Sequence, residues 1–147
     1  MAKLVRSLRK RSLLRLVFLA AALLAAAILI CYFTQDKPRL NTLEGRQSFL
    51  RDRGWEIDLG TEEHKTVRIP TSLDGVIEEY NKLQLEQGCD LSKHLGQSCE
   101  QYSYTVTNYP DQSQTVLVTL YVQNGRLIAG DIHSTALNGF MRGLRRE

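Results

Sequence analysis

The chain has 147 residues, enough for one domain of ordinary size, and a formal net charge of +3. Six of its 19 Lys and Arg residues lie within residues 1–33, which hold no acid, so the remainder has 13 basic and 16 acidic residues and a net charge of −3. The length excludes a multidomain protein. The acidic remainder argues against nucleic-acid binding, which normally needs a basic surface, so we expect no nucleic-acid partner.

Residues 16–33 form an apolar stretch without a charge, directly after the basic cluster. A helix of this length spans about 27 Å at 1.5 Å per residue, close to the hydrocarbon thickness of a bilayer. Basic residues on its N-terminal side favour a cytoplasmic N-terminus. The prediction is a single-pass anchor in the cell membrane, with the C-terminal part of the chain outside the cytoplasm.

Three other interpretations of this stretch stay open. A cleavable signal peptide needs small residues after its apolar core, whereas Ile30, Tyr32 and Phe33 are large. A lipid on Cys31 would need a small residue in place of Ile30. A buried core helix is rarely apolar all round at this length. A retained anchor, with its two aromatic residues at the outer interface, agrees best with the pattern.

The chain is therefore expected to have four parts. Pro38 blocks continuation of the membrane helix and marks a short polar linker. The expected parts are a basic cytoplasmic segment (1–15), a transmembrane anchor (16–33), a linker (34–41) and an extracytoplasmic domain (42–147).

The domain opens with a predicted helix, "NTLEGRQSFLRDRGW". Asn41 or Thr42 can cap its start, and Gly54 suits its end. Trp55 then falls where an apolar residue packs back onto the helix, so we expect it in the core. Two short alternating segments, "WEIDL" and "KTVRIP", predict two strands, and a hairpin is the expected connection between them.

The next segment, "TSLDGVIEEYNKLQLEQG", predicts the second helix. Its Val76, Ile77, Tyr80 and Leu83 share one face at helical spacing, which favours contact with a core. Gly88 ends the helix.

Three strands follow, "CEQYSYTVTN", "QTVLVTLYVQ" and "GRLIAGDIHS", with an Asn-Gly hairpin turn between the last two. Their alternation gives one apolar face, which includes Ile128 and Ile132, and one largely polar face. The predicted class is α+β: after the membrane helix, two helices on one face of an antiparallel sheet, in the order α-β-β-α-β-β-β, and then an irregular tail.

Cys89 and Cys99 are a candidate disulfide, because oxidation is permitted outside the cytoplasm. Closing such a loop would stabilise by roughly 3 kcal/mol in the chain-entropy model. A metal site that also used His94 would have three ligands at an unusual spacing. A cysteine nucleophile would need a base that the sequence does not reveal. We predict no metal and no cofactor.

The leading functional hypothesis is a non-enzymatic interaction module that binds a protein or envelope component. Leu117 and Tyr121 are apolar on an otherwise polar strand face, so the candidate contact face is Leu117, Thr119 and Tyr121. One alternative is a hydrolase that uses Asp131 and His133, which point to the same side of the last strand. The other is a structural or sensory accessory subunit that acts through its Ala-rich membrane helix.

Several segments, taken together and in order, resemble a known family. They are "FLRDRGWEIDL", "TVRIP", "EEYNKLQLEQGCDLSKHLGQ", "YSYTVTNYP", "VQNGRLIAGDIHS" and "LNGFMRGL". They are similar to the domain of unknown function 4830, found in small membrane-anchored proteins of Firmicutes, chiefly Clostridia. The resemblance covers about residues 45–144. It implies a Gram-positive source, an N-terminal anchor and a small outer domain, and it transfers no catalytic residue. Cys89 and Cys99 depart from the family pattern.

Overall fold

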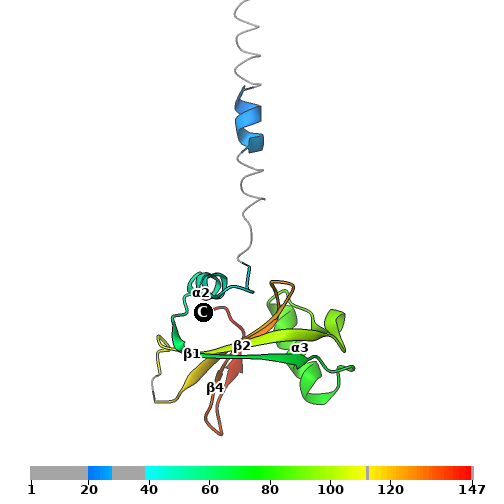
Figure 1. Ribbon diagram of the computed structural model, residues 1–147, viewed down its shortest axis with the longest axis vertical. Helices are drawn as coiled ribbons and strands as arrows, with labels where there is room; N and C mark the ends of the chain where they lie inside the picture. The colour runs from blue at the N-terminus through cyan, green and yellow to red at the C-terminus, as the bar shows by residue number, and fades with distance from the viewer. Residues whose placement is uncertain (1–19, 28–38, 112, 147) are drawn as a thin grey trace, which may run out of the picture. The chain divides into compact units, whose positions relative to one another are not determined.

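The computed structural model describes residues 20–27, 39–111 and 113–146 (Figure 1). The chain divides into two compact units, Met1–Lys37 and Pro38–Glu147. In the first unit, residues 20–27 are helical. The described part of the chain contains no helix with the length and apolarity needed to cross a membrane. The predicted basic segment, Cys31, and most of the predicted anchor and linker lie outside the described residues.

The described residues of the second unit form an antiparallel sheet with helices around it. The sheet has five strands in the order β1-β2-β3-β4-β5. The elements are α2 (Leu43–Arg51), β1 (Ile57–Arg68), α3 (Gly75–Glu86), the 3-10 helix η1 (Leu91–His94), β2 (Ser98–Val106), β3 (Val116–Gln123), β4 (Arg126–Ser134) and β5 (Met141–Arg142). Each pair of neighbouring strands is antiparallel, which confirms the predicted α+β class.

Helix α2 begins and ends as its sequence predicts. Of the two candidate caps, Thr42 is the one used: its Oγ1 accepts a hydrogen bond from the backbone N–H of Gly45 at 3.1 Å. Gly54 adopts φ +81°, and the backbone N–H of Trp55 then donates to the Leu50 carbonyl at 3.0 Å. Trp55 is 1% exposed, which confirms its predicted place in the core.

The two strands predicted at "WEIDL" and "KTVRIP" are parts of one strand, β1, so the predicted hairpin was wrong. Both parts pair with β2. The register moves from Asp58 opposite Thr105 to Glu63 opposite Ser103, so the residues between them form a bulge. The N–H of Gly60 donates to the Asp58 carboxylate at 2.9 Å within this bulge. The backbone therefore kinks there and continues, instead of reversing.

Helix α2 covers one face of the sheet, which we call the α2 face. Alternate residues of β2, β3 and β4 point to this face and pack with Phe49, Leu50 and Trp55. The sheet residues of this core are Tyr102, Tyr104, Val106, Val116, Val118, Leu120, Val122 and Ile132.

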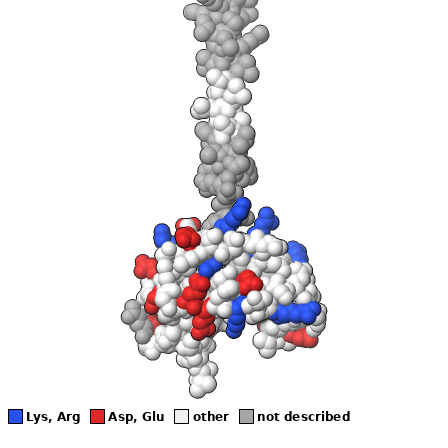
Figure 2. Space-filling view, viewed as in Figure 1, with Lys and Arg blue, Asp and Glu red and all other residues white. Residues whose placement is uncertain are grey.

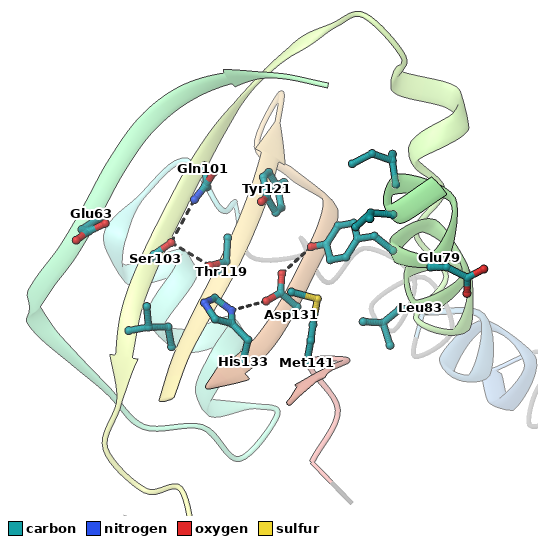
Figure 3. Close-up of a pocket in the computed structure, with 14 residues that line it drawn as sticks. Glu63, Glu79, Leu83, Gln101, Ser103, Thr119, Tyr121, Asp131, His133 and Met141 are labelled. Atoms are coloured by element: carbon teal, nitrogen blue, oxygen red, sulfur yellow. Dashed lines mark hydrogen bonds and ion pairs between the residues drawn. The ribbon is translucent and has the colours of Figure 1, made fainter. Parts of the chain in front are cut away.

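Helix α3 lies beside the edge of the sheet at β4 and adjoins the opposite face, which we call the α3 face (Figures 1 and 3). The Tyr80 hydroxyl donates to Asp131, whose neighbour Ile132 points to the α2 face. The prediction that both helices cover one face was therefore wrong. The physical reason is that the polar face of the sheet is not left open to water. Helix α3 covers part of this face, and Ser103 and Thr119 on it are only 7% and 4% exposed.

The end of the sheet at β4 and β5 also differs from prediction. The register between β3 and β4 shifts after Tyr121, so Ile128 packs with Ile69 and Leu91 in a second apolar cluster, apart from Ile132. The predicted irregular tail contributes the short strand β5, which pairs with β4.

Charged residues are spread over the surface of this unit. On the face that Figure 2 shows, Lys and Arg side chains alternate with Asp and Glu side chains and with uncharged surface, so the charge on this face is of mixed sign.

Candidate functional site

A groove of about 650 Å³ lies between α3 and the α3 face of the sheet, and we call it the α3 groove. Its size lies within the range of small-molecule and cofactor pockets, roughly 300–1,000 Å³. Figure 3 shows the helix on one side, the strands on the other and the polar groups between them. The lining residues are Glu63, Val76, Ile77, Glu79, Tyr80, Leu83, Gln101, Ser103, Leu117, Thr119, Tyr121, Asp131, His133 and Met141.

The shape of the groove follows from how α3 is attached to the sheet. Near the C-terminal end of the helix, Gln84 Oε1 accepts from the N–H of Gly130 at 2.8 Å, and Nε2 of Gln87, the residue after the helix, donates to the Gly130 carbonyl at 3.0 Å. These two side-chain amides take the place of a paired strand at the edge of β4. At the N-terminal end, Val76 is 83% exposed. The helix is thus tied down at one end and open at the other.

Gly130 also lets the C-terminal segment pack closely on β4. A Cβ atom there would lie 2.7 Å from Leu144 Cδ1 and 3.0 Å from the Thr119 carbonyl oxygen. The absence of a side chain therefore makes room for Leu144.

The centre of the groove floor is the Asp131 carboxylate, which is 2% exposed. Its Oδ2 accepts from the Tyr80 hydroxyl at 2.6 Å, and its Oδ1 accepts from His133 Nδ1 at 2.7 Å. Burial and the carboxylate raise the pKa of Tyr80 well above its ordinary value, so this hydroxyl stays a donor. The hydrogen bond to Asp131 raises the pKa of His133 against the opposing effect of burial. Asp131 therefore holds the proton of His133 on Nδ1 and leaves Nε2 for other partners.

Beside this cluster is a pair of hydroxyls. Ser103 Oγ and Thr119 Oγ1 are 3.0 Å apart and hydrogen-bonded, and Gln101 Nε2 donates to Ser103 Oγ at 3.5 Å. The rings of Tyr80 and Tyr121 meet edge to face, with centroids 6.3 Å apart. Burial raises the pKa of Tyr121 to about 12, so this residue too is neutral at physiological pH. The groove thus combines apolar and aromatic walls with a small number of polar groups.

The polar groups match part of a nucleophilic triad. Asp131 orients His133 as the acid of such a triad does. However, among residues 39–111 and 113–146 no hydroxyl is hydrogen-bonded to the His133 ring, and those of Ser103 and Thr119 bond each other. These residues thus supply a base and its orienting group, and no nucleophile among them is hydrogen-bonded to that base.

Two hypotheses from the sequence meet in this groove. The candidate contact residues Leu117, Thr119 and Tyr121 and the candidate acid–base pair Asp131 and His133 all line it. Thr119 lies at the floor and not on an open polar face, since it is 4% exposed. Leu117 and Tyr121 are half-buried.

The sequence did not point to the helical side of the groove. The apolar face of α3, which includes Ile77, Tyr80 and Leu83, was expected to pack in a core. Tyr80 does pack against the second apolar cluster, and all three residues also form a wall of the groove. Helical spacing alone does not distinguish a helix face that packs in a core from one that lines a groove. Met141, expected in an irregular tail, also lines the groove and is 55% exposed.

The predicted disulfide between Cys89 and Cys99 is not formed, and both are free thiols. Cys99 is buried among Ile69 and other residues of the second apolar cluster, whereas Cys89 follows the end of α3. Burial raises the pKa of each thiol, which disfavours the reactive thiolate. His94, the third member of the alternative metal site, bonds Gln123 Oε1 through Nδ1 at 2.9 Å.

Comparison with known proteins gives one match. No curated protein and no solved structure matches the chain. A family model matches residues 49–132, more than half of the chain, from within α2 to within β4. This segment includes Tyr80, Thr119, Tyr121 and Asp131 of the groove, and it ends one residue before His133. The chain belongs to the family described as domain of unknown function (DUF4830).

Proposed function

We propose that this protein is a non-enzymatic binding module of the cell surface, and that a protein partner occupies the α3 groove. Residues 16–33 hold the module at the outer side of the cell membrane of a Gram-positive bacterium, with the N-terminus in the cytoplasm. The observation that carries the proposal is the groove itself, about 650 Å³ with exposed apolar side chains at its rim.

The exposed apolar residues support binding in preference to catalysis. Val76 and Met141 line the groove although they are 83% and 55% exposed. Large apolar side chains left in water at the rim of a concave site gain free energy when a partner covers them. The hydrolase alternative lacks a hydroxyl bonded to His133 among the described residues.

Site-directed photocrosslinking in native membranes tests the proposal. A photoreactive benzoylphenylalanine replaces Val76 at the groove rim in the full-length chain. The matched control carries the same group at Leu85, which is also exposed on α3 and does not line the groove. We expect an adduct of defined mass from position 76 and none from position 85. The adduct should be lost when Leu117 and Tyr121 are both changed to alanine.

The same crosslinking measurement shows which result refutes the groove, and a helix exchange separates the accessory-subunit alternative. If adducts from both positions are equal, or if the double alanine variant keeps its adduct, the groove is not the site. Exchange of residues 16–33 for an unrelated membrane helix tests the accessory-subunit alternative. Loss of the partner on this exchange alone would favour contact through the membrane helix.

A further inference from the structure

We infer that the segment bound in the α3 groove is an apolar peptide that carries an arginine or lysine, and that Glu63 recognises the cation. This inference rests on the proposed function and names the chemical class of the partner segment.

The charges at the groove favour a cationic ligand. Its lining includes three carboxylates and neither Lys nor Arg, and its one group that can gain a positive charge, His133, is paired with the Asp131 carboxylate. Asp131 is buried and bonded to His133, and Glu79 bonds the exposed Lys82 at 2.6 Å. Glu63 is exposed on β1 and forms no ion pair with any described residue. Glu63 and Glu79 lie on opposite sides of the groove in Figure 3.

The aromatic residues reinforce this preference. Tyr80 and Tyr121 both line the groove, and their ring faces attract cations. A guanidinium or ammonium group on an apolar segment would meet the Glu63 carboxylate at the rim, and the tyrosine rings add a second surface that favours positive charge elsewhere in the groove. An acidic segment would meet repulsion from Glu63 without a compensating Lys or Arg among the lining residues.

The floor distinguishes a peptide from a cationic amphiphile with a hydrocarbon chain. Ser103 and Thr119 at the floor bond each other, but Nε2 of His133 bonds no described residue. A hydrocarbon chain laid over His133 would bury this atom without a partner, which is costly. A backbone N–H or C=O group of a peptide can bond it.

The length of the hollow also suits an extended segment. A second hollow of about 200 Å³ shares Ile77, Tyr80, Gln101 and Tyr121 with the α3 groove, so the two adjoin. The second hollow runs on to Ile69 and Pro70 beyond the end of β1. An extended peptide can occupy both hollows, whereas a compact ligand would not fill them.

Three synthetic peptides test the inference, each labelled with a fluorophore. The first is Gly-Leu-Leu-Arg-Leu-Leu-Gly, the second has Glu in place of Arg, and the third has Ser in place of each Leu. Their binding is measured by fluorescence anisotropy to the full-length chain in phosphatidylcholine nanodiscs, with empty nanodiscs as the blank. We expect the arginine peptide to bind about tenfold more tightly than the glutamate peptide, and the serine peptide to show no binding.

The variant Glu63→Gln tests whether the preference for the arginine peptide over the glutamate peptide depends on the Glu63 carboxylate. It should reduce the arginine preference to about threefold or less, and Glu86→Gln should leave it unchanged. Glu86 is a fair control because it is an exposed carboxylate of α3 that does not line the groove. Equal binding of the arginine and glutamate peptides, or equal effects of the two variants, would overturn the inference.

Hexylammonium chloride tests the class of ligand. Displacement of the arginine peptide by this amphiphile at equal concentration would overturn the assignment to a peptide. The inference and the proposed function can fail separately. A groove-dependent adduct at position 76 together with no arginine preference refutes only the inference, whereas absence of that adduct refutes the proposed function.

Discussion

Removal of the Tyr80 hydroxyl should weaken the folded state measurably. Tyr80→Phe keeps the ring and its edge-to-face contact with Tyr121 but deletes the donor that lies 2.6 Å from Asp131 Oδ2. Because Asp131 is 2% exposed, water cannot readily replace that donor. A hydrogen bond to a charged group contributes about 1.5–3 kcal/mol net, so we expect the free energy of unfolding to fall by about 2 kcal/mol.

Urea unfolding of the full-length chain in a mild detergent measures this change. Trp55 is the single tryptophan and is 1% exposed, so its fluorescence reports on loss of the core. The variant should unfold at lower urea with an unchanged slope. Tyr109→Phe is the matched control, because it removes the same atom from a tyrosine that stacks on Phe140 and donates no hydrogen bond to a described residue. Its effect should be within about 0.5 kcal/mol.

Equal losses in the two tyrosine variants would refute the reasoning. A double-mutant cycle of Tyr80→Phe with Asp131→Asn makes the test stricter, since both residues belong to one hydrogen bond. A coupling energy near zero would show that the bond does not stabilise the folded chain.

Three further predictions follow from the same region. Asp131 raises the pKa of His133, so protonated His133 stabilises the fold; this contribution is full below the unfolded-state pKa of about 6.5 and is lost as the pH rises through the raised pKa. His133→Gln should therefore flatten the decline of the urea midpoint from about pH 6 to pH 8, and identical profiles would contradict this. Gly130→Ala should lower stability by about 1–3 kcal/mol through its clash with Leu144, and an unchanged thermal midpoint would be inconsistent with that contact. Cys89 and Cys99 should both take up maleimide after unfolding without reductant, and a midpoint that falls on addition of reductant would mean that they are bonded.

Local chemistry accounts for the parts of the fold that were predicted well. The start and end of α2 depend on a Thr42 cap and a left-handed Gly54, which are properties of a few adjacent residues. The Asn124-Gly125 turn between β3 and β4 is of the same kind, since both residues adopt positive φ. The alternation along β3 likewise follows from the period of an extended chain.

Segments that depend on distant partners were predicted less well. The alternation of apolar and polar residues around a glycine in β1 is compatible with either a hairpin or one bulged strand. The segment forms one strand because both of its halves pair with β2. The shift after Tyr121 turned Ile128 away from Ile132, although simple alternation placed them together. A bulge changes the face of each residue beyond it, and its position depends on the neighbouring strand.

Local pattern and composition were enough to predict the α+β class, the ends of α2 and the core position of Trp55. The family followed from the resemblance of several segments taken together and in order. Only the tertiary structure decided that α3 stands beside the opposite face of the sheet. Two glutamine amides, one from α3 and one from the residue that follows it, hold the edge of β4 at Gly130, a contact between segments more than forty residues apart. That attachment leaves the apolar face of α3 partly uncovered and creates the groove. An amphipathic helix shows in its sequence that one face avoids water, but the partner that covers this face is fixed by long-range packing.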